Sequence, residues 1–404
     1  MTILFTLVNF LVIAFVARVM WKKLATADTL IFWSALILKL AAGVSIGLVY
    51  MYYYTDVGDT FTFFQDSIHL ANGEPSMITT EPRSRFFVTI LSVVNIITFN
   101  NYWVTSLWLS LYSFVCCYWL VTKLDVVMPS LRMASRIALL FTPSVVFWTS
   151  GIIKECVAFG AVAIIVVHFL SFMRGEKLTW LKAISLIVFM YLLLNLKYYW
   201  GAVLLTSLLS GLVVHWTVEK RINDPWKLVA SWLAVFFVFA FVASFTHPNF
   251  WPSRFLQVLV ENHDIYIVRS APEKLIHYHN LTPDWASVII NSPWALFSGL
   301  FRPVIFEAQP PFGYLAGLEN LLLLVIVLWK LRYIRMPLQE NRVVVFTAVM
   351  YVVVLCIFLA LSTPNFGTLS RFRTGFLPFF VLLILADHPI LNFINGKPSH
   401  HIRS

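Results

Sequence analysis

The chain has 404 residues, of which 60% are hydrophobic and only 12% are charged, and it carries a formal net charge of +10 at pH 7. Because apolar runs extend along its whole length, its composition indicates a polytopic membrane protein and excludes a soluble domain with a single anchor. The excess of Lys and Arg over Asp and Glu does not indicate nucleic-acid binding, since no basic cluster with interleaved aromatic residues lies outside the predicted loops.

Apolar stretches near or above the length needed to cross a bilayer follow one another along the chain. We therefore predict an all-α fold with about eleven transmembrane helices. Two regions leave this count open by one or two, because 286–301 suits a re-entrant segment and 136–173 contains a sharp break. The predicted spans are 3–19, 30–54, 102–122, 136–150, 155–173, 180–197, 199–217, 227–246, 313–331, 343–361 and 373–389.

The placement of Lys and Arg predicts the orientation of these spans. Most of these residues fall in short loops or chain ends on one side, which the positive-inside rule assigns to the cytoplasm. The C-terminus then lies in the cytoplasm, and two long loops, 55–101 and 247–312, face outside. Because no internal repeat or soluble linker interrupts the pattern, we expect one integral membrane domain over 1–404. The net positive charge then serves orientation and attraction to anionic lipids.

Both long loops carry amphipathic segments. In the first loop, apolar residues at near-helical spacing predict a short helix lying along the membrane surface, and a second apolar segment, 85–97, is too short to span. The larger loop holds several Trp and Tyr residues, which favour the lipid–water interface. We therefore expect both loops to fold onto the membrane and roof a cavity. The apolar face of the first predicted helix consists of Phe61, Phe64, Ile68 and Leu70.

Ionisable residues recur at the outer ends of the predicted spans. Such groups are costly near a membrane interior unless they face water, a cation or a substrate. Acidic groups come early in the chain and mostly basic groups come late, which predicts one polar site at the outer membrane surface. The candidates are Asp56, Asp59 and Asp66 in the first loop, Lys154 and Glu155 between two spans, Lys197 at a hairpin, and Arg302, Arg371 and Arg373 further on.

These residue types suit transfer from a phosphorylated lipid. A carboxylate within reach of an acceptor hydroxyl serves as general base, or holds a divalent cation such as Mg²⁺ or Mn²⁺ that neutralises a leaving phosphate. The planar fork of Arg suits phosphate oxygens. Structural roles are the alternatives: Asp59 capping a helix, Asp66 on a solvated face, Lys154 and Glu155 paired with each other, and Arg371 and Arg373 reaching toward lipid headgroups.

Two stretches carry a family resemblance. The segment from Ser370 to Phe379, with its Arg371-Phe372-Arg373 and Pro378-Phe379, resembles the Arg-Tyr/Phe-Arg and Pro-Phe segment near the C-terminus of many bacterial GT-C glycosyltransferases. The segment from Pro143 to Glu155 is similar to bacterial membrane proteins that act on cell-surface polysaccharides. With a first outer loop that begins with acidic residues, the layout of most of the chain resembles the GT-C superfamily.

This resemblance implies a bacterial inner-membrane enzyme whose active site faces the periplasm. It would transfer a sugar from a polyprenyl-phosphate donor to a lipid-linked or cell-envelope acceptor. Asp56 or Asp59 would supply the essential acid of the first loop, and Glu155 with Lys154 the second polar position. Arg371 and Arg373, with Lys197, Arg302 and Asp66, would complete substrate binding, and Asp59 or Glu155 would hold a metal if one is used.

Other functions fit parts of the same pattern. A polysaccharide polymerase would use similar chemistry on two lipid-linked glycans. A flippase or transporter would use Lys39, which lies within a predicted span, together with Lys197 and the arginines along a path. A scaffold for an envelope complex would tolerate substitution of every one of these charges.

Overall fold

Helices make up the regular structure of the described chain. The computed structural model describes residues 2–25, 28–53, 59–219, 221–222, 224–245, 247–251, 254–308, 311–331 and 342–394. Within these residues the only strand-like pairing is an isolated antiparallel bridge between Leu275 and Asn365. The predicted all-α class is confirmed for this part of the chain.

Long apolar helices confirm a multi-pass membrane protein. Eight described helices have the length and composition to cross a bilayer, or nine when Phe366–Gly375 and Leu377–Leu385, which meet at a bend of 68°, are counted as one broken span. One of the eight, Trp180–Glu219, has 40 residues and is divided by a break in helical geometry at Lys197. The predicted number of eleven spans remains a prediction.

The chain folds into two compact units, which we describe separately; a single domain over 1–404 stays a prediction. Unit 1 comprises 1–127, 139–171 and 176–201, and unit 2 comprises 128–138, 172–175 and 202–404. Unit 1 contains α1 (Thr2–Leu24), α2 (Thr29–Tyr52), α3 (Asp59–Ala71), α4 (Arg85–Thr98), α5 (Tyr102–Val127), α7 (Pro143–Trp148), most of α8 (Lys154–Met173) and the first part of α9 (Trp180–Val214). Unit 2 contains the rest of α9 with α6 (Arg132–Arg136), α10 (Pro225–Ala243), α11 (Phe255–Arg269), α12 (Trp285–Phe301), α13 (Phe312–Leu331), α14 (Arg342–Ser362), α15 (Phe366–Phe372), α16 (Leu377–Leu385) and α17 (Pro389–Ile394).

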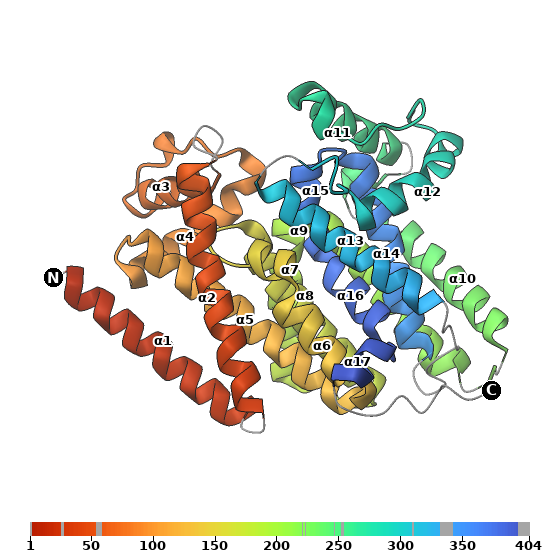
Figure 1. Ribbon diagram of the computed structural model, residues 1–404, viewed down its shortest axis with the longest axis horizontal. Helices are drawn as coiled ribbons and strands as arrows, with labels where there is room; N and C mark the ends of the chain where they lie inside the picture. Colours follow the sequence, from red (N-terminus) through yellow and green to blue (C-terminus); the bar gives the residue numbers. More distant parts are fainter. Residues whose placement is uncertain are drawn as a thin grey trace. The chain divides into compact units, whose positions relative to one another are not determined.

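Small residues bring α2 close to α5, and both helices lie beside each other in Figure 1. The Ser106 hydroxyl donates to the carbonyl of Gly43 at 2.8 Å, and a Cβ added at Gly43 would come within 2.2 Å of the Ser110 Oγ. The Ser110 Oγ also accepts the backbone N–H of Gly151 at 2.9 Å. Since Gly151 has a φ of +69°, the left-handed turn that precedes α8 suits glycine and is held against the α2–α5 pair.

The predicted span 136–150 is not one continuous helix, and the sharp break that we expect within 136–173 is confirmed. Its residues form the end of α6, a π-helical turn over Ile137–Phe141 and the short helix α7. Pro143 explains the interruption, because it lacks a backbone N–H and disfavours helical geometry at Thr142, which is extended here with a ψ of 118°. Both α7 and the start of α8 belong to unit 1.

In unit 2, α12 packs against α14 and α14 packs against α16. Trp232 of α10 is buried, stacks on Phe236 with 5.1 Å between ring centroids, and donates from Nε1 to the Thr347 hydroxyl of α14 at 3.0 Å. Tyr351 of α14 donates from its hydroxyl to the carbonyl of Gly375 at 2.8 Å, next to the bend between α15 and α16. This arrangement fixes the segment that carries Arg371 and Arg373.

Candidate functional site

The first long loop folds into two helices, as predicted. Helix α3 begins at Asp59 and helix α4 covers the predicted apolar segment 85–97. A buried chain of hydrogen bonds ties both helices to α5: the Asn95 amide donates to the Ser67 hydroxyl at 2.6 Å, and the Thr105 hydroxyl donates to Asn95 at 2.8 Å. Buried polar groups that are fully paired rigidify their surroundings. These hydrogen bonds therefore hold α3 and α4 against the N-terminal end of α5.

Asp59 occupies the first position of α3 and is exposed. Phe63 lies one turn further along the same face of the helix and is buried. The Nζ atom of Lys154, at the start of α8, lies 5.5 Å from the centroid of the Phe63 ring. The Asp59 carboxylate therefore belongs to the face of α3 that meets α8. Asp56 lies outside the described residues.

Glu155 pairs with Lys197, and both are deeply buried. The Lys197 Nζ lies 2.6 Å from the Glu155 Oε1, with side chains 4% and 0% exposed. The backbone of Lys197 leaves helical geometry, at φ −146° and ψ 69°, and this break separates the two predicted spans 180–197 and 199–217. The same Nζ donates to the Tyr199 hydroxyl at 3.2 Å and lies 5.7 Å from the centroid of the Trp200 ring. A buried carboxylate is thus neutralised by a cation from a neighbouring helix.

The described contacts of Lys154 and Glu155 are with other residues, and the pairing of the two with each other stays a prediction. Lys154 turns toward the surface helices and donates to the Ser84 hydroxyl, next to the start of α4, at 2.8 Å. Successive helical residues point about 100° apart, so one can meet α3 and α4 while the next faces α9. The start of α8 therefore presents a cation to the surface helices and an anion to the interior.

Asp66 is buried, which corrects the expectation of a solvated position. Its carboxylate accepts the backbone N–H groups of Thr79 and Thr80 at 3.1 and 2.7 Å, and both threonine hydroxyls donate to it as well. A buried carboxylate needs such hydrogen-bond donors, because water cannot reach it. Asp66 therefore holds the turn between α3 and α4, a role that the helical spacing of the loop did not reveal.

Lys39 is buried within α2 and binds the end of α7. Its Nζ donates to the Thr149 hydroxyl, which in turn donates to the carbonyl of Val145 at 2.6 Å. A cation at the C-terminal end of a helix is favoured by the helix dipole. The described contacts of Lys39 thus stabilise the break that leads into α8.

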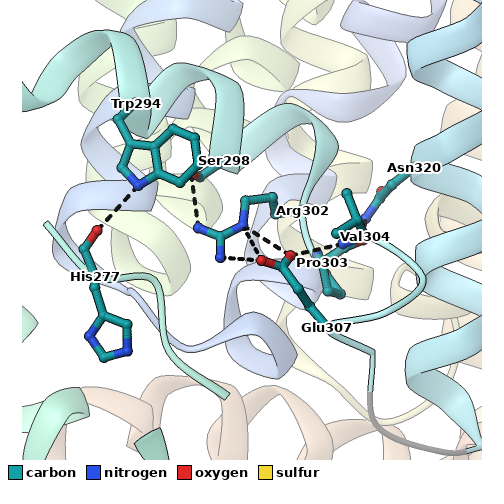
Figure 2. A network of polar contacts seen from close by, with 8 residues as sticks. All are labelled: His277, Trp294, Ser298, Arg302, Pro303, Val304, Glu307 and Asn320. Atoms are coloured by element: carbon teal, nitrogen blue, oxygen red, sulfur yellow. Dashed lines mark hydrogen bonds and ion pairs between the residues drawn. The ribbon is translucent and has the colours of Figure 1, made fainter. Parts of the chain in front are cut away.

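In unit 2, Arg302 lies between the Trp294 ring and the Glu307 carboxylate (Figure 2). Its Nε lies 3.0 Å from both carboxylate oxygens of Glu307, and its guanidinium carbon lies 4.9 Å from the Trp294 ring and 5.0 Å from the Phe366 ring. The Trp294 Nε1 donates to the carbonyl of His277 at 3.2 Å. Arg302, a predicted phosphate ligand, is thus already bound to a carboxylate.

The Arg302–Glu307 pair shapes its own loop. Burial opposes ionisation of Glu307, but hydrogen bonds from Arg302 and from the Val304 N–H outweigh it and hold the pKa of this carboxyl below its ordinary value of 4.5. A group whose folded-state pKa is lowered stabilises the fold fully above its unfolded pKa, and that stabilisation is lost as pH falls through the folded pKa.

We therefore expect the loop 302–308 to lose protection as pH falls from about 4.5, the ordinary pKa of Glu, through the lower pKa that Glu307 has in the folded protein. Hydrogen–deuterium exchange from pH 7 down to about pH 3, corrected for intrinsic rates, should show this loss in the wild type and a flat profile in Glu307→Gln. The same steep profile in the Gln variant would show that another group controls the loop.

Arg373 is fully buried and belongs to a network of hydrogen bonds that reaches the loop 302–308. Its Nη1 donates to the Asn320 side chain at 2.6 Å, and its Nη2 lies 3.8 Å from the Glu319 carboxylate. Asn320 in turn donates to the carbonyl of Pro303 at 2.8 Å, as Figure 2 shows. Arg371 is 9% exposed. The late arginines therefore gather in unit 2, whereas Asp59, Lys154, Glu155 and Lys197 gather in unit 1.

Metal and redox sites have little support in the described part of the chain. No group of three or more His, Cys, Asp or Glu side chains there lies close enough to hold a metal ion. The four cysteines are buried and free. The predicted divalent cation remains a prediction, because the Asp56 position is not described.

No protein-family model, curated protein or solved structure matches this chain. The GT-C resemblance thus rests on the sequence segments and on the layout of the polar residues.

Proposed function

We propose that the protein is a membrane glycosyltransferase that moves a sugar from a polyprenyl-phosphate donor to a lipid-linked or cell-envelope acceptor on the outer face of the bacterial inner membrane. The observation that supports this most is the grouping in unit 1. An exposed carboxylate, Asp59, lies on the α3 face that meets Lys154, and the next residue of α8, Glu155, forms a buried pair with Lys197.

Asp59 acts as the general base in this proposal. It accepts the proton of the acceptor hydroxyl while the hydroxyl oxygen attacks the anomeric carbon of the donor sugar. The bond between the anomeric carbon and the phosphate oxygen breaks, and polyprenyl phosphate leaves. Because the base activates the acceptor directly, the anomeric configuration inverts. Asp56, three residues before Asp59, is the second candidate for this role.

Lys154 binds the donor phosphate in this proposal. Its ammonium lies beside α3 and α4, where an anionic headgroup can reach it, and a single positive charge stabilises the departing phosphate. The buried Glu155–Lys197 pair fixes the start of α8 and the break of α9, and so positions Lys154. Arg371 and Arg373 remain proposed phosphate ligands, and Arg302 would have to leave Glu307 to join them.

A divalent cation would change the proposed role of Asp59 from general base to metal ligand. If Mg²⁺ or Mn²⁺ is required, Asp59, with Asp56, is better suited to bind it than Glu155, whose carboxylate is already neutralised by Lys197. The cation would then neutralise the leaving phosphate, and an acceptor hydroxyl would need less help from a base.

The test is turnover of radiolabelled polyprenyl-phosphate sugars by purified protein, with and without EDTA, followed by chromatography of the lipid products. We expect release of polyprenyl phosphate and a glycosylated acceptor, and EDTA sensitivity would make one of the carboxylates a metal ligand. Turnover of only polyprenyl-diphosphate glycans, with growth of chain length, would replace this proposal with a polymerase.

A further inference from the structure

The serine that precedes α4 does not cap that helix. Ser84 occupies the N-cap position, where a serine hydroxyl commonly accepts a hydrogen bond from the first turn, but it makes no such bond here. The chain enters α4 from a 3₁₀ turn, η3 (Pro82–Ser84), and Ser84 has a φ of −109° and a ψ of −7°. Capping side chains belong to extended backbone, so this near-helical conformation does not suit capping. The hydroxyl is therefore available to a residue outside α4.

That residue is Lys154, at the start of α8. Its Nζ donates to the Ser84 Oγ at 2.8 Å, and Ser84 is only 6% exposed. A hydrogen bond from a charged donor is stronger than one between neutral groups, and the burial of Ser84 keeps water from competing for it. The bond thus restrains the end of a long and flexible side chain.

The same ammonium also lies near an aromatic ring of α3. The Lys154 Nζ is 5.5 Å from the centroid of the Phe63 ring, a distance at which the ring attracts a cation. Phe63 in turn packs edge-on against Phe87 of α4, with 5.5 Å between ring centroids, and both rings are buried. Because α3 and α4 are joined through this pair, Phe63 and Ser84 hold Lys154 from two helices that pack against each other.

The turn that carries Ser84 is itself tied to α3. The Asp66 carboxylate of α3 accepts the backbone N–H of Thr80 at 2.7 Å, four residues before Ser84. The Ser84 N–H then donates to the carbonyl of Glu81 at 2.8 Å. The position of the Ser84 hydroxyl is thus set by the fold of the first loop. A cation that is held in place before an anion binds loses less conformational freedom on binding.

We propose that Ser84 is a positioning residue, which holds the Lys154 ammonium in place for the phosphate of the donor lipid. This inference rests on the proposed function, in which Lys154 binds that phosphate. The Ser84 hydroxyl acts through Lys154 and does not bind the phosphate itself. Because an ammonium donates up to three hydrogen bonds, it can bind Ser84 and a phosphate oxygen at the same time.

Binding of farnesyl phosphate to the purified protein in detergent micelles, measured by microscale thermophoresis, tests this role. Ser84→Ala should weaken this binding by about tenfold, the loss expected when one hydrogen bond to a charged group is removed. Ser84→Thr keeps the hydroxyl and should restore wild-type binding.

Farnesol, which has the same chain without the phosphate, separates positioning from a structural role. It should bind the wild type and Ser84→Ala equally, because only the cation is displaced. Equal weakening of farnesol and farnesyl phosphate in Ser84→Ala would show that the substitution disturbs α3 and α4 as a whole, and would overturn the inference. The matched control is Ser92→Ala, whose hydroxyl donates to the Thr89 carbonyl within α4 and which should bind both probes like the wild type.

Lys154→Gln distinguishes failure of this inference from failure of the proposed function. We expect it to weaken farnesyl phosphate binding at least as much as Ser84→Ala does. If Lys154→Gln weakens binding and Ser84→Ala does not, Lys154 needs no help from Ser84, and the inference fails while the proposed function stands. Wild-type binding by Lys154→Gln would contradict the proposed role of Lys154 and the inference with it.

Discussion

Replacing Lys197 with Met is expected to destabilise the protein by roughly 3–5 kcal/mol, the typical cost of removing one partner from a buried ion pair. The substitution keeps the length of the side chain but leaves the fully buried Glu155 carboxylate without its cation at 2.6 Å. Neither membrane lipid nor the apolar core can solvate that charge. Reversible unfolding in mixed micelles measures the difference.

The control for this prediction is the double variant Glu155→Leu/Lys197→Met. Because a buried ion pair replaced by apolar side chains is often close to neutral in stability, the double variant should recover most of the loss. If Lys197→Met alone were as stable as the wild type, the pair would not be the buried, mutually neutralising contact that we describe.

Asp59→Asn is expected to lower the rate of sugar transfer by about 100- to 10,000-fold, the range typical of a lost general base. Asn keeps the shape of the side chain at the exposed start of α3, so folding and thermal stability should stay close to those of the wild type. A general base acts in the transition state, so the loss should fall on kcat and leave KM nearly unchanged.

Asp125→Asn provides the matched control. Asp125 belongs to unit 1, like Asp59, but lies near the C-terminal end of α5. It should transfer sugar like the wild type. Full activity of Asp59→Asn would identify Asp56 as the general base. Full activity of the double variant Asp56→Asn/Asp59→Asn would refute carboxylate catalysis in the first loop.

The local structure of the first loop could be predicted from the sequence. Apolar spacing over 61–70 and 85–97 is a short-range signal, and both segments are helices in the structure. The gap between the predicted spans at 198 also lies beside the real break, because Lys197 is costly inside a continuous apolar helix. These features depend on neighbouring residues alone.

The pairing within the candidate site could not be predicted in this way. Glu155 and Lys197 come together through the packing of α8 against α9. Nothing in the sequence favours Lys197 as the partner of Glu155 over Lys154, which directly precedes Glu155. Asp66 was expected in solvent, since its burial depends on how the chain returns at Thr79 and Thr80. Long-range contacts decide these positions.

The pairing of Arg302 did leave a signal in the sequence. Glu307 follows Arg302 by five residues, with Pro303 between them, and a turn of this length brings the two side chains within reach. A short loop that contains both charges favours a local ion pair over a shared phosphate site. Arg373 carried no such signal, because its partner Asn320 lies on a different helix.

The central claim, that this protein transfers a sugar and does not merely move a lipid-linked glycan, is tested most directly in proteoliposomes. Radiolabelled polyprenyl-phosphate sugar and acceptor are supplied on one face, and the lipid products are identified by mass spectrometry for the wild type and for Asp59→Asn. We predict a new glycosidic product with the wild type and none above background with the variant. Appearance of unchanged donor on the opposite face, with no product in either protein, would contradict the account and identify a transporter.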